Sequence, residues 1–243
     1  MDEAAEIVNY LPLSFKSLKE QEYIAFLWDA FETNYTHGKY QFAFLAYHML
    51  TMSFVYFNIW QIKQARPEDF EKGLIGFGKD IEKNLLCASS PFVFSTVNER
   101  SILRLLKLIA CDNGKIGTYA KLVDDRNETA HPNGNIFFST QAALDAKINE
   151  ILRVVDEIQT YSRPVIEHCY QDFLLNSHDS EEREYPDAAD QIREIFIHGY
   201  YLSQKDVKIC LEFDTQALRE HPGFAEIEEL HQCLDTGWGD LNS

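Results

Sequence analysis

The chain has 243 residues, of which 45% are apolar and 25% are charged, with 11 glycines and 7 prolines. This composition is that of an ordinary globular protein long enough to bury its own core, and it excludes collagen-like, low-complexity and wholly disordered chains. The formal net charge of −17 argues at first against binding to nucleic acid, because Lys and Arg supply the affinity for phosphate.

Apolar residues recur with the period of an α-helix along the chain, and capping and proline signals divide the pattern into helices. A capping box at Ser17 opens the first long helix, and Pro67 stands at a first-turn position of the third. The predicted helices run over residues 17–36, 39–65, 66–87, 96–113, 115–131 and 140–176. Pro164 is expected to kink or break the last of these helices.

The second helix contains twenty residues, 41–60, without Asp, Glu, Lys or Arg, which is long enough to span a bilayer. Five polar side chains interrupt this stretch, and their burial costs less in a protein core with hydrogen-bond partners than in lipid. No second stretch of this kind follows. The sequence therefore predicts a buried central helix and no membrane association.

A polar, acidic segment at residues 177–187 is the best candidate for a linker. Three short helical segments, about 187–201, 204–218 and 223–235, and a Gly-rich acidic tail at residues 235–243 follow it. We therefore expect an all-α fold, with a helical bundle over residues 1–177 and a small acidic helical extension over residues 187–243.

The charge is unevenly distributed, since residues 1–37 carry −5, residues 38–140 carry +2 and residues 141–243 carry −14. Only the middle region can face a polyanion, whereas the acidic ends would suppress non-specific binding or offer a surface to a basic partner. Arg100, Arg104 and Lys107 stand at i, i+4 and i+7. These three residues form either a solvated helix face or a ridge that contacts RNA phosphates.

The five cysteines are odd in number, widely spaced and without a Cys-x-x-Cys pair, so we expect free thiols. The first residues are acidic, whereas a secretory signal would carry positive charge before an apolar run. These features predict a cytoplasmic protein in a reducing compartment.

Polar residues replace apolar ones near the end of the helix at 115–131, because the stripe that includes Ile116 and Val123 continues to Asn127 and His131. Arg126 lies five residues before His131, about 140° away around an ideal helix. Pro132 must end or distort the last turn, so we expect both side chains to reach one mouth at the helix terminus.

The hexamer Arg126-Asn127-Glu128-Thr129-Ala130-His131 resembles the signature of HEPN-domain proteins, in which Arg and a polar residue precede a His near the end of a bundle helix. The resemblance covers this hexamer and, loosely, the helical layout of residues 1–177. It implies a metal-independent endoribonuclease with no cofactor, in a toxin, stress or phage-defence role. It also implies a homodimer in which two motifs face each other, with an antitoxin or other regulatory protein as a further partner.

The residue types suit this reaction. Attack by the 2′-hydroxyl of RNA needs a proton acceptor, a proton donor and positive charge on the transition state. His131 can accept or donate the proton. The charged guanidinium of Arg126 can donate hydrogen bonds to the phosphate, and Asn127 would orient the His or a phosphate oxygen. Because a single His cannot easily serve both sides of phosphorus in one step, two motifs in one cleft are expected.

Two alternatives remain open at this point. Arg126 can simply pair with a neighbouring acid while His131 caps the helix, in a non-catalytic module that binds a protein partner. Two Glu-x-x-His spacings, ending at His131 and His231, match the pattern of di-iron bundles, but neither lies on a long helix with further glutamates opposite. We therefore predict no metal site.

Overall fold

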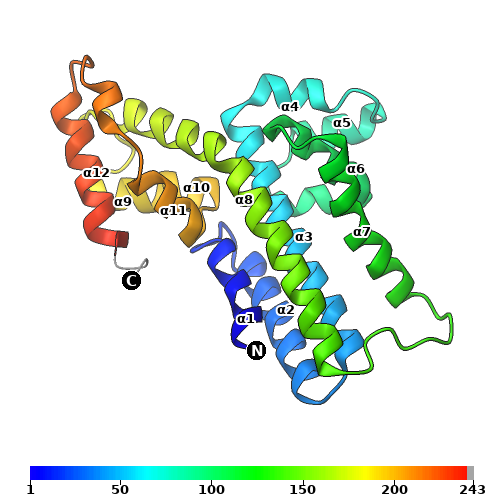
Figure 1. Ribbon diagram of the computed structural model, residues 1–243. Helices are drawn as coiled ribbons and strands as arrows, with labels where there is room; N and C mark the ends of the chain where they lie inside the picture. The colour runs from blue at the N-terminus through cyan, green and yellow to red at the C-terminus, as the bar shows by residue number, and fades with distance from the viewer. Residues whose placement is uncertain (240–243) are drawn as a thin grey trace.

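α3 (Tyr40–Ala65) is the central helix of the protein, and α2, α7 and α8 pack against it (Figure 1). The computed structural model describes residues 1–239, which contain α-helices, shorter 3-10 and π-helical segments and no β-strand. The predicted all-α fold is therefore confirmed. The other helices up to residue 177 are α1 (Asp2–Ala5), α2 (Leu18–Thr36), α4 (Pro67–Gly73), α5 (Lys79–Leu86), α6 (Glu99–Leu103), α7 (Asn113–Ala130) and α8 (Gln141–Ser177). Three 3-10 helices lie between them: η1 (Glu6–Tyr10), η2 (Pro91–Thr96) and η3 (Arg104–Ile109).

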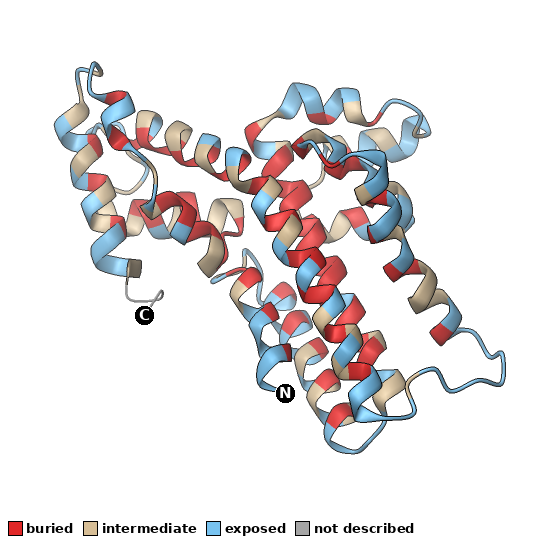
Figure 2. Ribbon diagram, viewed as in Figure 1, coloured by how far each residue is buried: buried red, intermediate tan, exposed pale blue. Residues whose placement is uncertain are grey.

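The burial of α3 agrees with the sequence prediction of a core helix. Among residues 1–239 it is the one helix long and apolar enough to cross a membrane, and 83% of its most apolar window is buried inside the protein. Every residue from Leu50 to Ile62 is buried, which covers all sides of the helix, and Figure 2 shows the buried colour along it. A helix that is apolar all round is typical of a protein core when other helices cover it.

Three of the polar side chains of α3 form hydrogen bonds that permit this burial. Thr51 and Ser53 donate hydrogen bonds to carbonyl oxygens one turn earlier in the same helix. Asn58 donates to the carbonyl oxygen of Phe54 and accepts a hydrogen bond of 2.5 Å from Ser162 on α8. Because these three side chains find partners, the cost of removing them from water is largely offset.

Two predicted helices are divided in the structure. Residues 66–87 form α4 and α5 rather than one helix, because the chain turns between them at Gly76, whose φ is +99°. The helix predicted at 96–113 is α6 followed by η3, and Ala110 ends it in the left-handed conformation with φ 66°. Asn113 therefore begins α7 and does not end the preceding helix, since Asp112 caps the new one.

α8 continues through Pro164 over 37 residues, so the predicted break is absent. The proline removes one backbone donor inside the helix. Extensive packing maintains the helix despite that loss, because its inner face contacts α3 along the bundle and α11 and α12 beyond it. Tertiary burial thus outweighs the local effect of the proline.

The C-terminal elements are also helical, but their bounds differ from the predicted ones. They comprise α9 (Ala188–Gln191), a π-helical segment (Ile192–Ile197), α10 (His198–Tyr200), α11 (Gln204–Leu211), the 3-10 helix η5 (Thr215–Leu218) and α12 (Phe224–Trp238). The helix predicted at 204–218 is thus two elements, and α12 extends beyond 235 into the predicted tail. Residues 240–243 of that tail lie outside the described residues.

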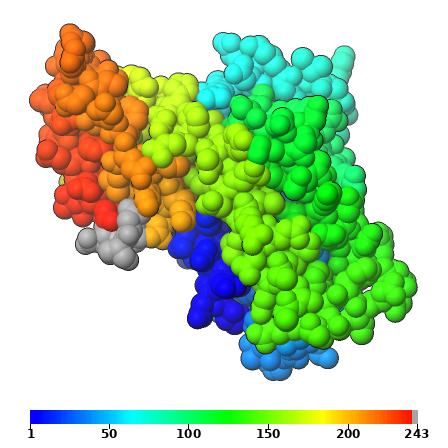
Figure 3. Space-filling model, viewed as in Figure 1, coloured from blue at the N-terminus to red at the C-terminus, as the bar shows by residue number. Residues whose placement is uncertain are grey.

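Buried polar contacts join these C-terminal elements to the bundle, against which they lie in Figure 3. Asp206 on α11 is 3% exposed and accepts hydrogen bonds from Gln61 on α3 and Gln159 on α8. The hydroxyl of Tyr201 donates to Glu20 on α2 at 2.9 Å. The chain after the predicted linker therefore shares polar contacts and hydrophobic core with residues 1–177.

Candidate functional site

The motif helix α7 begins and ends at local signals. Asp112 accepts a hydrogen bond from the Lys115 backbone N–H at the first turn. The helix ends at Ala130, and His131 is extended with ψ 141°, as the following Pro132 requires. The predicted stop at the proline is confirmed. It leaves His131 exposed, at the start of the segment between α7 and α8, which Figure 1 shows at the edge of the molecule.

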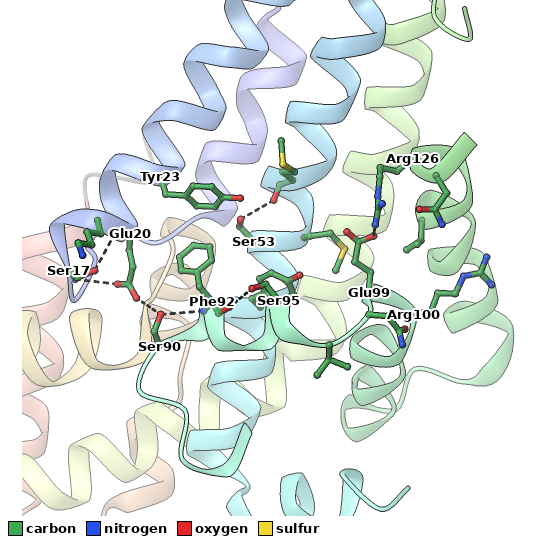
Figure 4. Close-up of a pocket in the computed structure, with 18 residues that line it drawn as sticks. Ser17, Glu20, Tyr23, Ser53, Ser90, Phe92, Ser95, Glu99, Arg100 and Arg126 are labelled. Carbon is green, nitrogen blue, oxygen red and sulfur yellow. Dashed lines mark hydrogen bonds and ion pairs between the residues drawn. The ribbon is translucent and has the colours of Figure 1, made fainter. Parts of the chain in front are cut away.

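Arg126 lies against Glu99, a residue of the first turn of α6 (Figure 4). The guanidinium Nη2 is 2.6 Å from Glu99 Oε2. The same carboxylate oxygen is 3.1 Å from Nε2 of His48, which lies on α3 and is 1% exposed. Glu99 therefore joins α3, α6 and α7 through one partly buried carboxylate.

Two opposing effects act on the pKa of Glu99. Burial alone would raise it, but hydrogen bonds from His48 and Arg126 and the electrostatic attraction of these two groups outweigh burial and hold the pKa below its ordinary value. The other ring nitrogen of His48, Nδ1, is buried without a hydrogen-bond partner among the described residues. The arrangement is that of an ionised carboxylate held between two donors.

Arg126 and Asn127 line a cavity of about 880 Å³ between α2, α3, α7 and the segment from η2 to α6 (Figure 4). Exposed residues such as Ser95 and Arg100 form part of its lining, so it opens to solvent. Its volume lies within the range of small-molecule binding sites. His131 is not among the lining residues.

The structure thus brings together two of the three predicted catalytic residues. Arg126 and Asn127 share the cavity, whereas His131 lies exposed beyond it, at the end of the same helix. The imidazole of His131 has no hydrogen bond or ion pair with any of residues 1–239. Arg126 and His131 of one chain were expected to share one opening. The cavity does not provide it, because its lining includes Arg126 but not His131.

The predicted basic stripe faces two different hollows. Arg100 forms an ion pair with Asp124 on α7 and lines the large cavity. Arg104 and Lys107 belong to the 3-10 helix η3, are exposed, and line a smaller hollow of about 260 Å³ beside the turn between α4 and α5. Arg104 and Lys107 stand at i and i+3 of this 3-10 helix and so lie on one side of it, whereas Arg100 lines the other cavity.

Sequence reasoning missed the roles of His48 and Glu99. Asn98 is the N-cap of α6 and accepts a hydrogen bond from the Ser101 N–H, so the side chain of Glu99 takes no part in capping. The carboxylate of Glu99 is therefore free to reach α7. The histidine inside the apolar stretch of α3 was the available signal for a buried polar contact.

Among residues 1–239 no group of three His, Cys, Asp or Glu side chains is placed to hold a metal ion. His231, from the second Glu-x-x-His spacing, instead forms a 2.8 Å hydrogen bond with the hydroxyl of Tyr170. The five cysteines are free thiols, as predicted.

The comparisons with known proteins identify no relative: no family model, no curated protein and no solved structure matches the sequence.

Proposed function

We propose that the protein is a metal-independent endoribonuclease of the cytoplasm that cleaves RNA by attack of the 2′-hydroxyl, in a toxin, stress or phage-defence role. The positions of the three motif residues are the main support for the proposal. Arg126 and Asn127 border an open cavity, and His131 presents an unpartnered imidazole to solvent at the end of the same helix. These are the groups that RNA cleavage without a metal needs.

In the proposed reaction, Arg126 binds the phosphate through the guanidinium donors that Glu99 leaves free, and it stabilises charge on the phosphorane-like transition state. His131 exchanges a proton with the 2′-hydroxyl or with the leaving 5′-oxygen. Asn127 donates a hydrogen bond that orients the phosphate. Arg104 and Lys107 are proposed to contact phosphates farther along the RNA, and Arg100 does so beside the cavity.

A homodimer completes this site. His131 lies outside the cavity that Arg126 lines, so one chain presents the two groups separately. A two-fold partner that brings its own motif to the same cleft would supply a second histidine, one accepting and one donating a proton.

Incubation of the purified protein with total RNA and a chelator tests the proposal. We expect fragments that end in 2′,3′-cyclic phosphate, and we expect His131→Ala to abolish them while sedimentation still shows a dimer. His168→Ala, which removes an exposed histidine on α8, is the matched control and should leave cleavage unchanged. Equal cleavage by His131→Ala and the unmodified protein would falsify the assignment.

The ion pair between Arg126 and Glu99 favours a second candidate function, that of a non-catalytic helical module that binds a protein. In this case the ion pair is structural, and residues 141–243, with a net charge of −14, provide a surface for a basic partner such as a regulatory protein. Intact RNA after incubation with the unmodified protein, under all salt conditions, would favour this candidate.

A further inference from the structure

A tyrosine hydroxyl without a hydrogen-bond partner among the described residues borders the cavity beside the motif. Tyr56 on α3 is 7% exposed and lines the cavity, and its hydroxyl has no hydrogen-bond partner among residues 1–239. Burial and the neighbouring Glu99 raise the pKa of this tyrosine, so its hydroxyl stays protonated and can donate as well as accept. A ligand in the cavity can therefore form a hydrogen bond with this hydroxyl.

Most of the rest of the lining is aromatic, apolar or neutral and polar, and Lys19 and Glu20 are the charged residues at its α2 end. Tyr23 and Phe92 lie side by side in Figure 4, with ring centroids 5.3 Å apart, and Met49 and Met52 add polarisable apolar surface. Asn127 contributes an amide that forms no side-chain hydrogen bond with the described residues. The lining can therefore contact the faces of a planar ring and hydrogen-bond to its edge.

The charges at the motif end of the cavity are paired. Arg126 is bound to Glu99, and Arg100 is bound to Asp124. A second anion would have to approach the carboxylate of Glu99, which is itself partly buried. A neutral ring is therefore favoured inside the cavity, and a phosphate is favoured only at its mouth.

We propose that this cavity holds one nucleobase of single-stranded RNA, flipped out of its stack next to the linkage that is cut. The proposal rests on the proposed function and specifies its substrate. A cavity of about 880 Å³ has room for a nucleoside, and protein sites that read single-stranded RNA stack unpaired bases on aromatic side chains and bond to their edges.

Nucleotide binding tests the proposal without any cleavage step. The four ribonucleoside 5′-monophosphates and ribose 5-phosphate, which lacks a base, are titrated into the full-length protein by calorimetry. We expect at least one nucleotide to bind and ribose 5-phosphate not to bind. Tyr56→Phe, which removes only the unpartnered hydroxyl, should raise the Kd about 3- to 10-fold, the usual effect of one lost hydrogen bond.

Two further variants complete the design. Ser95→Trp places a large ring on an exposed residue of the lining and should abolish nucleotide binding with little risk to folding. Tyr185→Phe removes a tyrosine hydroxyl in the segment between α8 and α9, away from the cavity, and should leave the Kd unchanged. Circular dichroism of each variant confirms that it is folded.

The proposal is overturned if ribose 5-phosphate binds as tightly as the best nucleotide, or if Tyr56→Phe and Ser95→Trp both leave nucleotide affinity unchanged. It is also overturned if the protein cleaves RNA but binds no nucleotide and Ser95→Trp cleaves as well as the unmodified chain. Nucleotide binding that Ser95→Trp abolishes, in a protein that leaves RNA intact, supports the base site and refutes only the nuclease function.

Discussion

Glu99→Gln tests whether one carboxylate holds the motif helix in place. The substitution keeps the size of the side chain and removes its charge. In the structure a single oxygen, Oε2, receives both His48 Nε2 at 3.1 Å and Arg126 Nη2 at 2.6 Å. The amide that replaces this carboxylate carries one oxygen and one NH₂ group, so it cannot accept from both donors with the same strength.

The expected loss of stability follows from this geometry. A hydrogen bond to a charged group contributes about 1.5–3 kcal/mol, and there are two of them. The exposed fractions of the Glu99 and Arg126 side chains, 18% and 32%, allow solvent to screen the pair. Glutamine retains part of the bonding. We therefore expect the free energy of unfolding to fall by about 2 kcal/mol.

Urea denaturation at pH 7 measures this loss, and a double-mutant cycle with Arg126→Ala isolates the pair. We expect a coupling energy of about 1 kcal/mol. The control is Glu68→Gln, which removes an exposed ion pair with Lys72 of 3.9 Å and should cost less than about 0.5 kcal/mol. A cycle with no coupling, or equal losses in the two Gln variants, would refute the reasoning.

The ion pair between Glu99 and Arg126 also predicts how the free energy of unfolding depends on pH. The pKa of Glu99 is lower in the folded state than in the unfolded chain, so the unfolded state binds a proton first as pH falls. The stabilisation is fully present above about pH 5 and is lost as pH falls through the folded pKa. In Glu99→Gln the free energy of unfolding should therefore fall less steeply as pH falls below about 5. An unchanged dependence on pH in this range would contradict the role given to Glu99.

Two other substitutions test surfaces and contacts elsewhere in the chain. Arg104→Glu should weaken RNA binding and lower the slope of log K against log salt by about 1, and an unchanged slope would show that this residue only faces solvent. Asp206→Asn should destabilise the protein by about 2 kcal/mol in urea denaturation, because its NH₂ group would replace one of the two oxygens and face the donor of either Gln61 or Gln159. Asp112→Asn, which exchanges one good helix cap for another, should cost far less and is its control.

Local sequence signals determined most of the helical structure. The capping box at Ser17, the stop at Pro132 and the burial of residues 41–60 agree with the structure because each depends on neighbours within about one turn or on one apolar surface. The same signals placed Arg126 and Asn127 near the end of a helix. Predictions failed where short-range signals competed, as at the glycine-rich turn after α4.

Only the tertiary structure decided what these residues contact. Arg126 meets Glu99 from 27 positions earlier and, through it, His48 from a third helix, while Tyr201 reaches Glu20 across 181 positions. Such pairs depend on how helices pack, and the period of an amphipathic helix reports which face is buried but not which helix covers it. For the same reason the sequence located the motif, whereas the structure showed the cavity beside it and the separate position of His131.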